Sequence, residues 1–196
     1  MTRISAFILL CITTLSSAAQ DAHLSPLKKH DVLVGFGFGS KSHFGNWGIT
    51  SNFLVTDKLN AKISIGGGQF NYNGFILSVG PEYCLPLSER YYLMLGTVGT
   101  LASGVYDVIN DDEPDRREYR TYRMKYIRSY TGIAYNLNGA LLKVEVGYSY
   151  ALRNPTFTLY HTWTPAQADK VKKGMDSGIL VSVCLQGIFH VGKKVY

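Results

Sequence analysis

Side chains of two kinds alternate along almost the whole chain after residue 31, and this period of two residues constrains the fold more than any other feature of the sequence. In eight segments, one parity is mostly aliphatic or aromatic and holds no charged residue. These segments are residues 32–38, 47–55, 63–69, 75–85, 91–101, 127–137, 142–150 and 179–189. Such alternation is typical of β-strands whose two faces meet different surroundings. The sequence therefore predicts eight two-faced strands.

Short and longer connections between these segments also alternate. Short turns are expected near residues 57–60, 88–89 and 138–139, and longer loops at 41–46, 71–74, 107–120 and 153–176. If consecutive strands run antiparallel, all the longer loops lie at one end. This arrangement is typical of an up-and-down barrel with two different ends. We therefore predict an all-β fold, an eight-stranded antiparallel up-and-down β-barrel.

Composition agrees with a β-rich protein and excludes other classes. Hydrophobic residues make up 46% of the 196 residues, which excludes a disordered chain, and charged residues only 17%. After residue 20, no apolar run approaches the roughly 18 residues that a transmembrane helix needs. The basic residues are dispersed along the chain, which disfavours nucleic-acid binding.

The start of the chain has the layout of a secretory signal peptide. Arg3 precedes an apolar stretch at residues 6–12, and small residues stand before a predicted cut at Gln20. The expected organisation is a signal peptide at 1–19, an N-terminal segment at 20–30 and the β-barrel domain at 31–196.

Alternation alone fits two opposite barrels. In a soluble, periplasmic lipocalin-like barrel the apolar face lines the interior and binds an apolar ligand, whereas in an outer-membrane barrel it meets lipid. The opposite face is rich in Gly and Ser, which suits a narrow lumen better than a surface exposed to water. Aromatic residues near both ends of the apolar face match the two interfacial belts of membrane proteins. The sequence favours the transmembrane barrel and keeps the soluble barrel as the alternative.

Three short motifs give the chain a resemblance to a known family. They are Gly-Phe-Gly-Phe-Gly at 35–39, Val-Gly-Pro-Glu-Tyr at 79–83 and Val-Glu-Val-Gly-Tyr-Ser-Tyr at 144–150. With the alternating segments, they make residues 31–196 similar to the small eight-stranded outer-membrane barrels of Gram-negative bacteria, which include porin-like proteins and the transmembrane domain of outer membrane protein A. The resemblance implies an exported protein of the cell outer membrane, with a structural or weakly conducting role and no cofactor.

Some barrels of this kind are lipid A acylases or deacylases that use a Ser/His pair near the outer rim, so a lipid-modifying enzyme is a further alternative. The histidines expected at that end are His43 and His161, both in loops. His161 lacks the His-x-Ser-Asn pattern of the deacylases, and no motif ties a serine to it. No spacing of His, Cys and carboxylates supports a metal site at either histidine. The sequence thus indicates no catalytic, metal-binding or cofactor-binding residue.

Five charged residues share the polar parity and are expected in the lumen: Lys62, Glu82, Arg128, Lys143 and Glu145. From their positions along the expected strands, all except Arg128 are placed in the lower half of the barrel. A charge enclosed among Gly and Ser must be paired or hydrated. The group therefore forms either a plug of salt bridges or a gated, narrow ion path, and the small bore of eight strands favours the plug.

Cys84 and Cys184 also share the lumen parity. They belong to strands four and eight, half the circumference apart. Because a disulfide needs Cα atoms within about 7 Å, both are expected to be free thiols that fill space.

Two cations mark the outer end of the sixth strand. Arg123 and Lys125 share its lipid-facing parity, and the strand descends from the third long loop. Their apolar stems can lie along the barrel while their charges stay at the interface. We expect them to contact outer-membrane lipid through the phosphates of lipopolysaccharide, with an ordinary solvated strand extension as the alternative.

The fourth long loop contains one helix signal. Thr164 can cap a helix that begins at Pro165 and stops at Gly174. The remainder of this loop, and the third loop with its acidic run at 111–115, are expected to be solvated.

Overall fold

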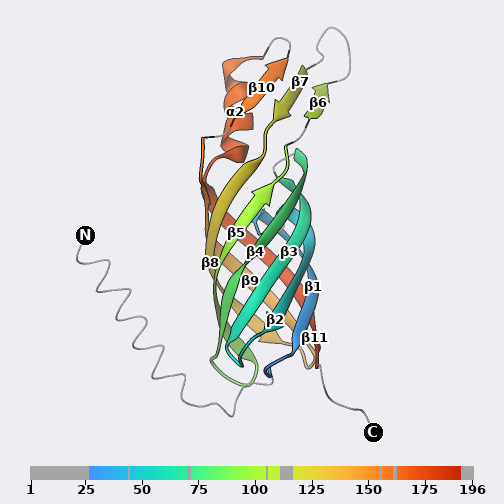
Figure 1. Ribbon diagram of the computed structural model, residues 1–196, viewed down its shortest axis with the longest axis vertical. Coiled ribbons are helices and arrows are strands. Elements are labelled where there is room, and N and C mark those ends of the chain that lie inside the picture. Colours follow the sequence, from blue (N-terminus) through green and yellow to red (C-terminus); the bar gives the residue numbers. More distant parts are fainter. Residues whose placement is uncertain are drawn as a thin grey trace, which may run out of the picture.

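Eight strands of the computed structural model close into an antiparallel β-barrel (Figure 1). The structure describes residues 27–43, 45–69, 72–104, 106–110, 117–154, 156–160 and 163–190. The barrel strands are β1 (Val32–Ser42), β2 (Gly45–Leu54), β3 (Leu59–Gln69), β4 (Tyr72–Pro86), β5 (Tyr91–Ala102), β8 (Met124–Asn136), β9 (Ala140–Ala151) and β11 (Gly178–Phe189). The first strand pairs with the last, which closes the barrel. The predicted fold class is confirmed, whereas the predicted signal peptide lies outside the described residues.

The apolar parity of these strands faces outward. On β9, Val144 is 51% exposed while its neighbour Lys143 is 1% exposed, and on β11 Ile179 is 68% exposed while Leu180 is buried. Successive side chains point to opposite faces of a strand, so the same alternation runs around the barrel. The apolar face is therefore on the outside and the polar face lines the lumen, the reverse of a lipocalin-like barrel.

Exposed aromatic residues gather in two rows near the ends of the strands. At one end, Phe38 pairs with Trp47, and Trp47 and Phe75 both pair with Gly67. At the other end, Phe53 and Phe189 both pair with Val32, and the rings of Tyr91 and Tyr135 lie 5.0 Å apart. Aliphatic residues such as Ile49 and Val144 occupy the band between the rows.

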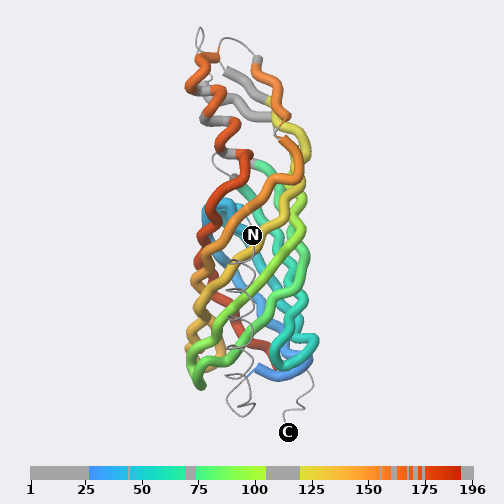
Figure 2. Tube along the Cα trace, turned by 90° about the vertical axis from the view of Figure 1, so that its left-hand side faces the viewer, coloured from blue at the N-terminus to red at the C-terminus, as the bar shows by residue number. Residues whose placement is uncertain are grey.

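A second, smaller structure stands beyond one end of the barrel (Figures 1 and 2). It consists of a three-stranded sheet of β6 (Tyr106–Asn110), β7 (Arg117–Thr121) and β10 (Phe157–Tyr160), with α2 (Pro165–Met175) beside it. We call it the outer extension. The helix expected at this place is present. Three strands stand where loops were expected, because β10 of the fourth loop pairs with β7 of the third. The acidic run at 111–115 lies outside the described residues.

The first two connections at this end are shorter than expected. β1 continues to Ser42 and β2 begins at Gly45, and β3 and β4 are separated only by residues 70–71. Gly45 and Gly68 adopt positive φ angles of 81° and 71°, and a Cβ on Gly45 would lie 2.3 Å from the Gly68 carbonyl oxygen. Glycine tolerates both the positive φ angle and the close approach of the backbones, because it has no Cβ. The two turns can therefore be tight and pack against each other. The predicted loops at 41–46 and 71–74 are therefore wrong in length.

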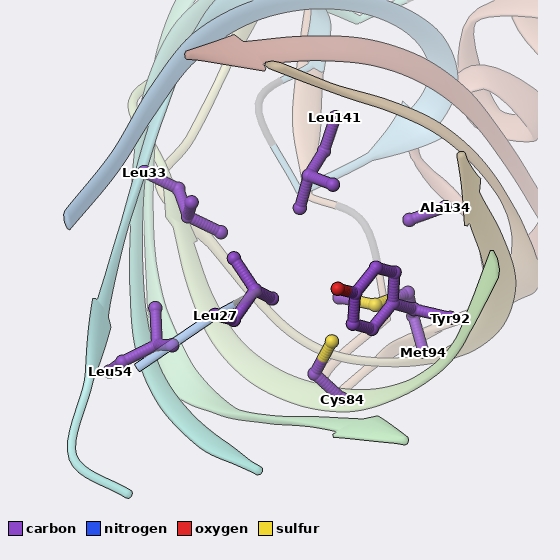
Figure 3. Packing of buried hydrophobic residues seen from close by; sticks show 8 residues of the cluster. All are labelled: Leu27, Leu33, Leu54, Cys84, Tyr92, Met94, Ala134 and Leu141. Atoms are coloured by element: carbon purple, nitrogen blue, oxygen red, sulfur yellow. The ribbon is translucent and has the colours of Figure 1, made fainter. Parts of the chain in front are cut away.

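The opposite end of the lumen is filled by apolar side chains, which we call the apolar floor (Figure 3). It consists of Leu27, Leu33, Leu54, Cys84, Tyr92, Met94, Ala134 and Leu141, all of them buried. Leu27 belongs to the segment that precedes β1, and its side chain is buried against the other residues of the floor. Beside it, Asp31 accepts a hydrogen bond from the Lys28 amide and lies 2.9 Å from His190 Nδ1, which links the two ends of the barrel domain.

Candidate functional site in the barrel lumen

A charged cluster crosses the lumen above the apolar floor, with Glu82 of β4 at its centre. One carboxylate oxygen lies 2.8 Å from Lys143 Nζ, and the other lies 2.8 Å from Lys62 Nζ. Asn52 and Asn60 donate further hydrogen bonds to the first oxygen. Glu82 is completely buried. Such a carboxylate is stable only because its oxygens are occupied by charged and polar donors.

Lys62 joins this carboxylate to a second one. Its ammonium group also lies 2.9 Å from Glu145 Oε1, and Ser182 donates a 2.7 Å hydrogen bond to the other oxygen of Glu145. His43 Nδ1 lies 3.4 Å from the same oxygen. Two lysines and two glutamates thus form one chain of ion pairs. We call Lys62, Glu82, Lys143 and Glu145 the ionic layer, in which two positive charges balance two negative ones.

Tyr130 of β8 covers the ionic layer from above. Its hydroxyl donates a 3.0 Å hydrogen bond to Glu82, and Lys62 Nζ lies 4.4 Å from the centre of its ring. Its cross-strand neighbours are Gly96 and Gly147, and a Cβ on either glycine would come within 2.7 Å of the tyrosine side chain. The glycines on both sides therefore make the space in which this ring lies.

Arg128 lies two residues further up β8 and is separate from the ionic layer. It is fully buried, donates to Ser149 Oγ at 3.1 Å and to the Ser42 carbonyl oxygen, and stands 5.0 Å from the Tyr126 ring. Tyr126 in turn donates to the carbonyl oxygen of Met175 at the end of α2. Arg128 therefore ties β8 to its neighbour β9 and, across the lumen, to the end of β1.

The outer mouth is bridged by Lys41, near the end of β1. Its ammonium group donates to the carbonyl oxygens of Lys173, Asp176 and Ser177, at and beyond the C-terminus of α2. A positive charge at this position also complements the helix dipole. Lys41 and Tyr126 thus attach the outer extension to the barrel, and Lys41 is only 7% exposed.

The sequence analysis identified the charged members of this site but not their polar partners. The structure brings Lys62, Glu82, Lys143 and Glu145 together and places Arg128 apart. Tyr130, Asn52 and Ser182 were missed, although they share the lumen parity, because their contacts depend on the register around the closed barrel. Cys84 and Cys184 are free and buried, as expected.

The structure describes one of the two histidines that the sequence analysis considered at the outer end. His43 is buried in the lumen, where its ring stacks on Tyr130 at 5.6 Å, and His161 lies outside the described residues. Among the described residues, no group of three or more His, Cys, Asp or Glu side chains is arranged to hold a metal ion. In the same residues, no helix is long and apolar enough to cross a membrane.

Of the two rim cations, Lys125 occupies the outward position that the parity predicts, whereas Arg123 precedes the strand. Lys125 is exposed on β8, and Arg123 is exposed between β7 and β8. Lys125 lies on the outward face of β8, opposite to the face that carries Arg128 and Tyr130 into the lumen.

Comparison with known proteins identifies the fold. No family model matches the chain, and no curated protein matches it. Among solved structures, the chain is similar to the N-terminal β-barrel domain of OprF from Pseudomonas aeruginosa, with a TM-score of 0.56, 12% identity, and coverage of 83% of this chain and 98% of that domain. CarO from Acinetobacter baumannii has a TM-score of 0.40 and 13% identity, with 80% and 97% coverage. The similarity to OprF confirms the expected resemblance to small eight-stranded barrels at the level of the fold.

Proposed function

We propose that this protein is a barrel of the cell outer membrane with a structural role and a lumen closed to ions. The observation that carries the proposal is the apolar outer surface of a closed barrel. Residues such as Ile49, Val144 and Ile179 are more than half exposed, although a protein in water would bury them. Lipid around the barrel removes this surface from water, and the two aromatic rows then lie at the membrane interfaces.

The soluble alternative fits this geometry poorly. A lipocalin-like barrel needs an apolar interior for its ligand, whereas this lumen holds Lys62, Glu82, Lys143 and Glu145 in mutual contact. For the enzyme alternative, the described residues supply one of the two histidines considered, His43, and it is buried in the lumen. The predicted signal peptide at residues 1–19 supports export to the outer membrane.

Accessibility of one outward position tests the membrane location. A cysteine at Val144, in a background with Cys84 and Cys184 changed to Ala, should resist a water-soluble maleimide and react with a lipid-phase probe. A cysteine at Lys172, exposed on α2, is the matched control and should react with the maleimide. Rapid aqueous labelling at Val144, or recovery of the protein in a high-speed supernatant without detergent, contradicts the proposal.

Conductance in planar bilayers tests the closed lumen separately. The wild-type protein should give no stable conductance steps, because the ionic layer and the apolar floor both cross the bore. Regular steps from the wild type, in a sample shown to be folded by its heat-modified gel mobility, would instead favour the narrow ion path.

A further inference from the structure

The exposed outer surface of β8 carries a positive charge in a row that is otherwise apolar. Lys125 pairs with Leu101 of β5 on one side, and its carbonyl oxygen accepts a hydrogen bond from the Leu152 amide on the other. Leu101 and Leu152 are 45% and 47% exposed. In the sheet, Lys125 therefore lies between two exposed leucines of the outer surface.

The height of this row follows from the strand register. Lys125 lies two residues beyond Ile127, which pairs with Tyr150, an exposed aromatic residue at the end of β9 nearest the outer extension. Two residues of an antiparallel strand cover about 7 Å, so the row is directly above that aromatic residue. Trp and Tyr side chains mark the head-group level of a membrane. If the barrel spans the outer membrane, Lys125 is at the head groups of the outer leaflet.

More cations continue this surface away from the membrane. Arg123 and Arg153 are exposed next to the row, and Arg120 stands 5.7 Å from the ring of the exposed Tyr122. Among the described residues, neither Arg123 nor Lys125 makes an ion pair with a carboxylate. We call Arg123, Lys125 and Arg153 the basic rim. It combines positive charge with an adjoining apolar row, which is the complement of a phosphorylated, acylated lipid.

We propose that the basic rim binds the phosphates of lipid A, the membrane anchor of lipopolysaccharide, while Leu101 and Leu152 contact its acyl chains. The inference rests on the proposed location in the outer membrane and adds a partner to it. Lys and Arg fit this task because their stems lie along apolar surface while their charged ends reach the interface. Each cation near an anionic membrane surface contributes about a five-fold gain in binding.

The test compares matched charge changes at the two ends of the barrel. The full-length protein is folded into phosphatidylethanolamine vesicles that contain lipid A, and the lipid A that co-purifies with it in non-ionic detergent is measured. Changing Arg123→Ser and Lys125→Ser together should lower retention about five-fold for each cation at low salt. Lys28→Ser with Lys29→Ser removes the same charge at the other end, where both residues are exposed, and should leave retention unchanged.

Two further arms define the chemistry. The exchange Arg123→Lys with Lys125→Arg keeps both charges and should retain lipid A. High ionic strength should shrink the difference between the wild type and the Ser pair, since salt screens exposed charges. Dephosphorylated lipid A should bind the wild type at least as weakly as intact lipid A binds the Ser pair, which still has Arg153.

Three outcomes overturn the inference: equal retention by the wild type and the Ser pair at low salt, an equal loss in the Lys28 and Lys29 control, or undiminished binding of dephosphorylated lipid A. Flotation of the same vesicles separates this failure from that of the proposed function. A protein that floats with the vesicles but shows any of these outcomes keeps its membrane location and loses the basic rim as a lipid A site.

Discussion

The apolar floor and the ionic layer fill neighbouring levels of the same lumen by opposite means. The floor gathers eight apolar residues, including Leu27 from outside the barrel strands. The ionic layer joins four charges through contacts of 2.8–2.9 Å. Apolar contacts are non-directional, so a floor that loses one side chain keeps the rest of its burial. The ionic layer is stable only as a complete set, because a lost partner leaves a buried charge behind.

The largest effect should come from breaking the ionic layer at its centre. Glu82→Ala leaves Lys143 without its carboxylate and Lys62 with one of its two. We expect a loss of about 3–5 kcal/mol in the free energy of unfolding, the usual result of breaking a buried ion pair. Urea unfolding followed by tryptophan fluorescence, with heat-modified gel mobility, measures it. An unchanged unfolding midpoint would show that water hydrates these charges.

A cavity in the floor should cost less. Leu141→Ala removes a fully buried side chain of the apolar floor. We expect a loss of about 2–3 kcal/mol, in the lower part of the range for buried leucines, because Leu27 lies on a terminal segment that can adjust. The same unfolding assay applies. A loss larger than that of Glu82→Ala would reverse the order of the two regions.

Removing both partners of one ion pair sharpens the contrast. Glu82→Leu with Lys143→Met leaves Lys62 with Glu145, so the remaining charges still balance. We expect the free energy of unfolding to stay within about 1 kcal/mol of the wild-type value, because apolar replacements of a whole buried pair are often neutral. A double variant as unstable as Glu82→Ala would mean that the hydrogen bonds from Tyr130 and Asn52 matter more than the balance of charge.

The smallest effect is expected at the edge of the floor. Asp31→Asn weakens the contact with His190, whose side chain is 46% exposed. Asp31 itself is buried, but solvent reaches His190 and an Asn oxygen can still accept a hydrogen bond there, so we expect a loss of about 0.5 kcal/mol. The thermal midpoint should hardly move. A large loss would indicate that Asp31 is needed for the turn in which its carboxylate accepts from the Lys28 amide.

The strands and their two faces could be predicted from the sequence because alternation is a local property of each strand. Val144 and Lys143 reveal their faces within β9 alone. The partners in the lumen could not be predicted in this way. Lys62 and Glu145 are 83 positions apart, and their contact depends on the register of every strand between them and on barrel closure.

Less of the structure at the ends of the barrel could be predicted from the sequence. β10 exists because it pairs with β7 across two different loops, and neither segment alternates over a length that marks a strand. The short turns at Gly45 and Gly68 depend on each other through close packing of their backbones. In both cases, the deciding contact joins segments that lie apart in the chain.

The attachment of Lys41 to the end of α2 has a consequence for the order of assembly. Lys41 and Asp176 are 135 positions apart, so bringing them together carries a large loop-closure cost that local hairpins do not have. Hairpins such as β2 with β3 can form early, whereas this contact needs β1 and β11 to have met. Docking of α2 therefore coincides with closure of the barrel. The fluorescence of a label on the helix would then follow the rate of this late step of folding.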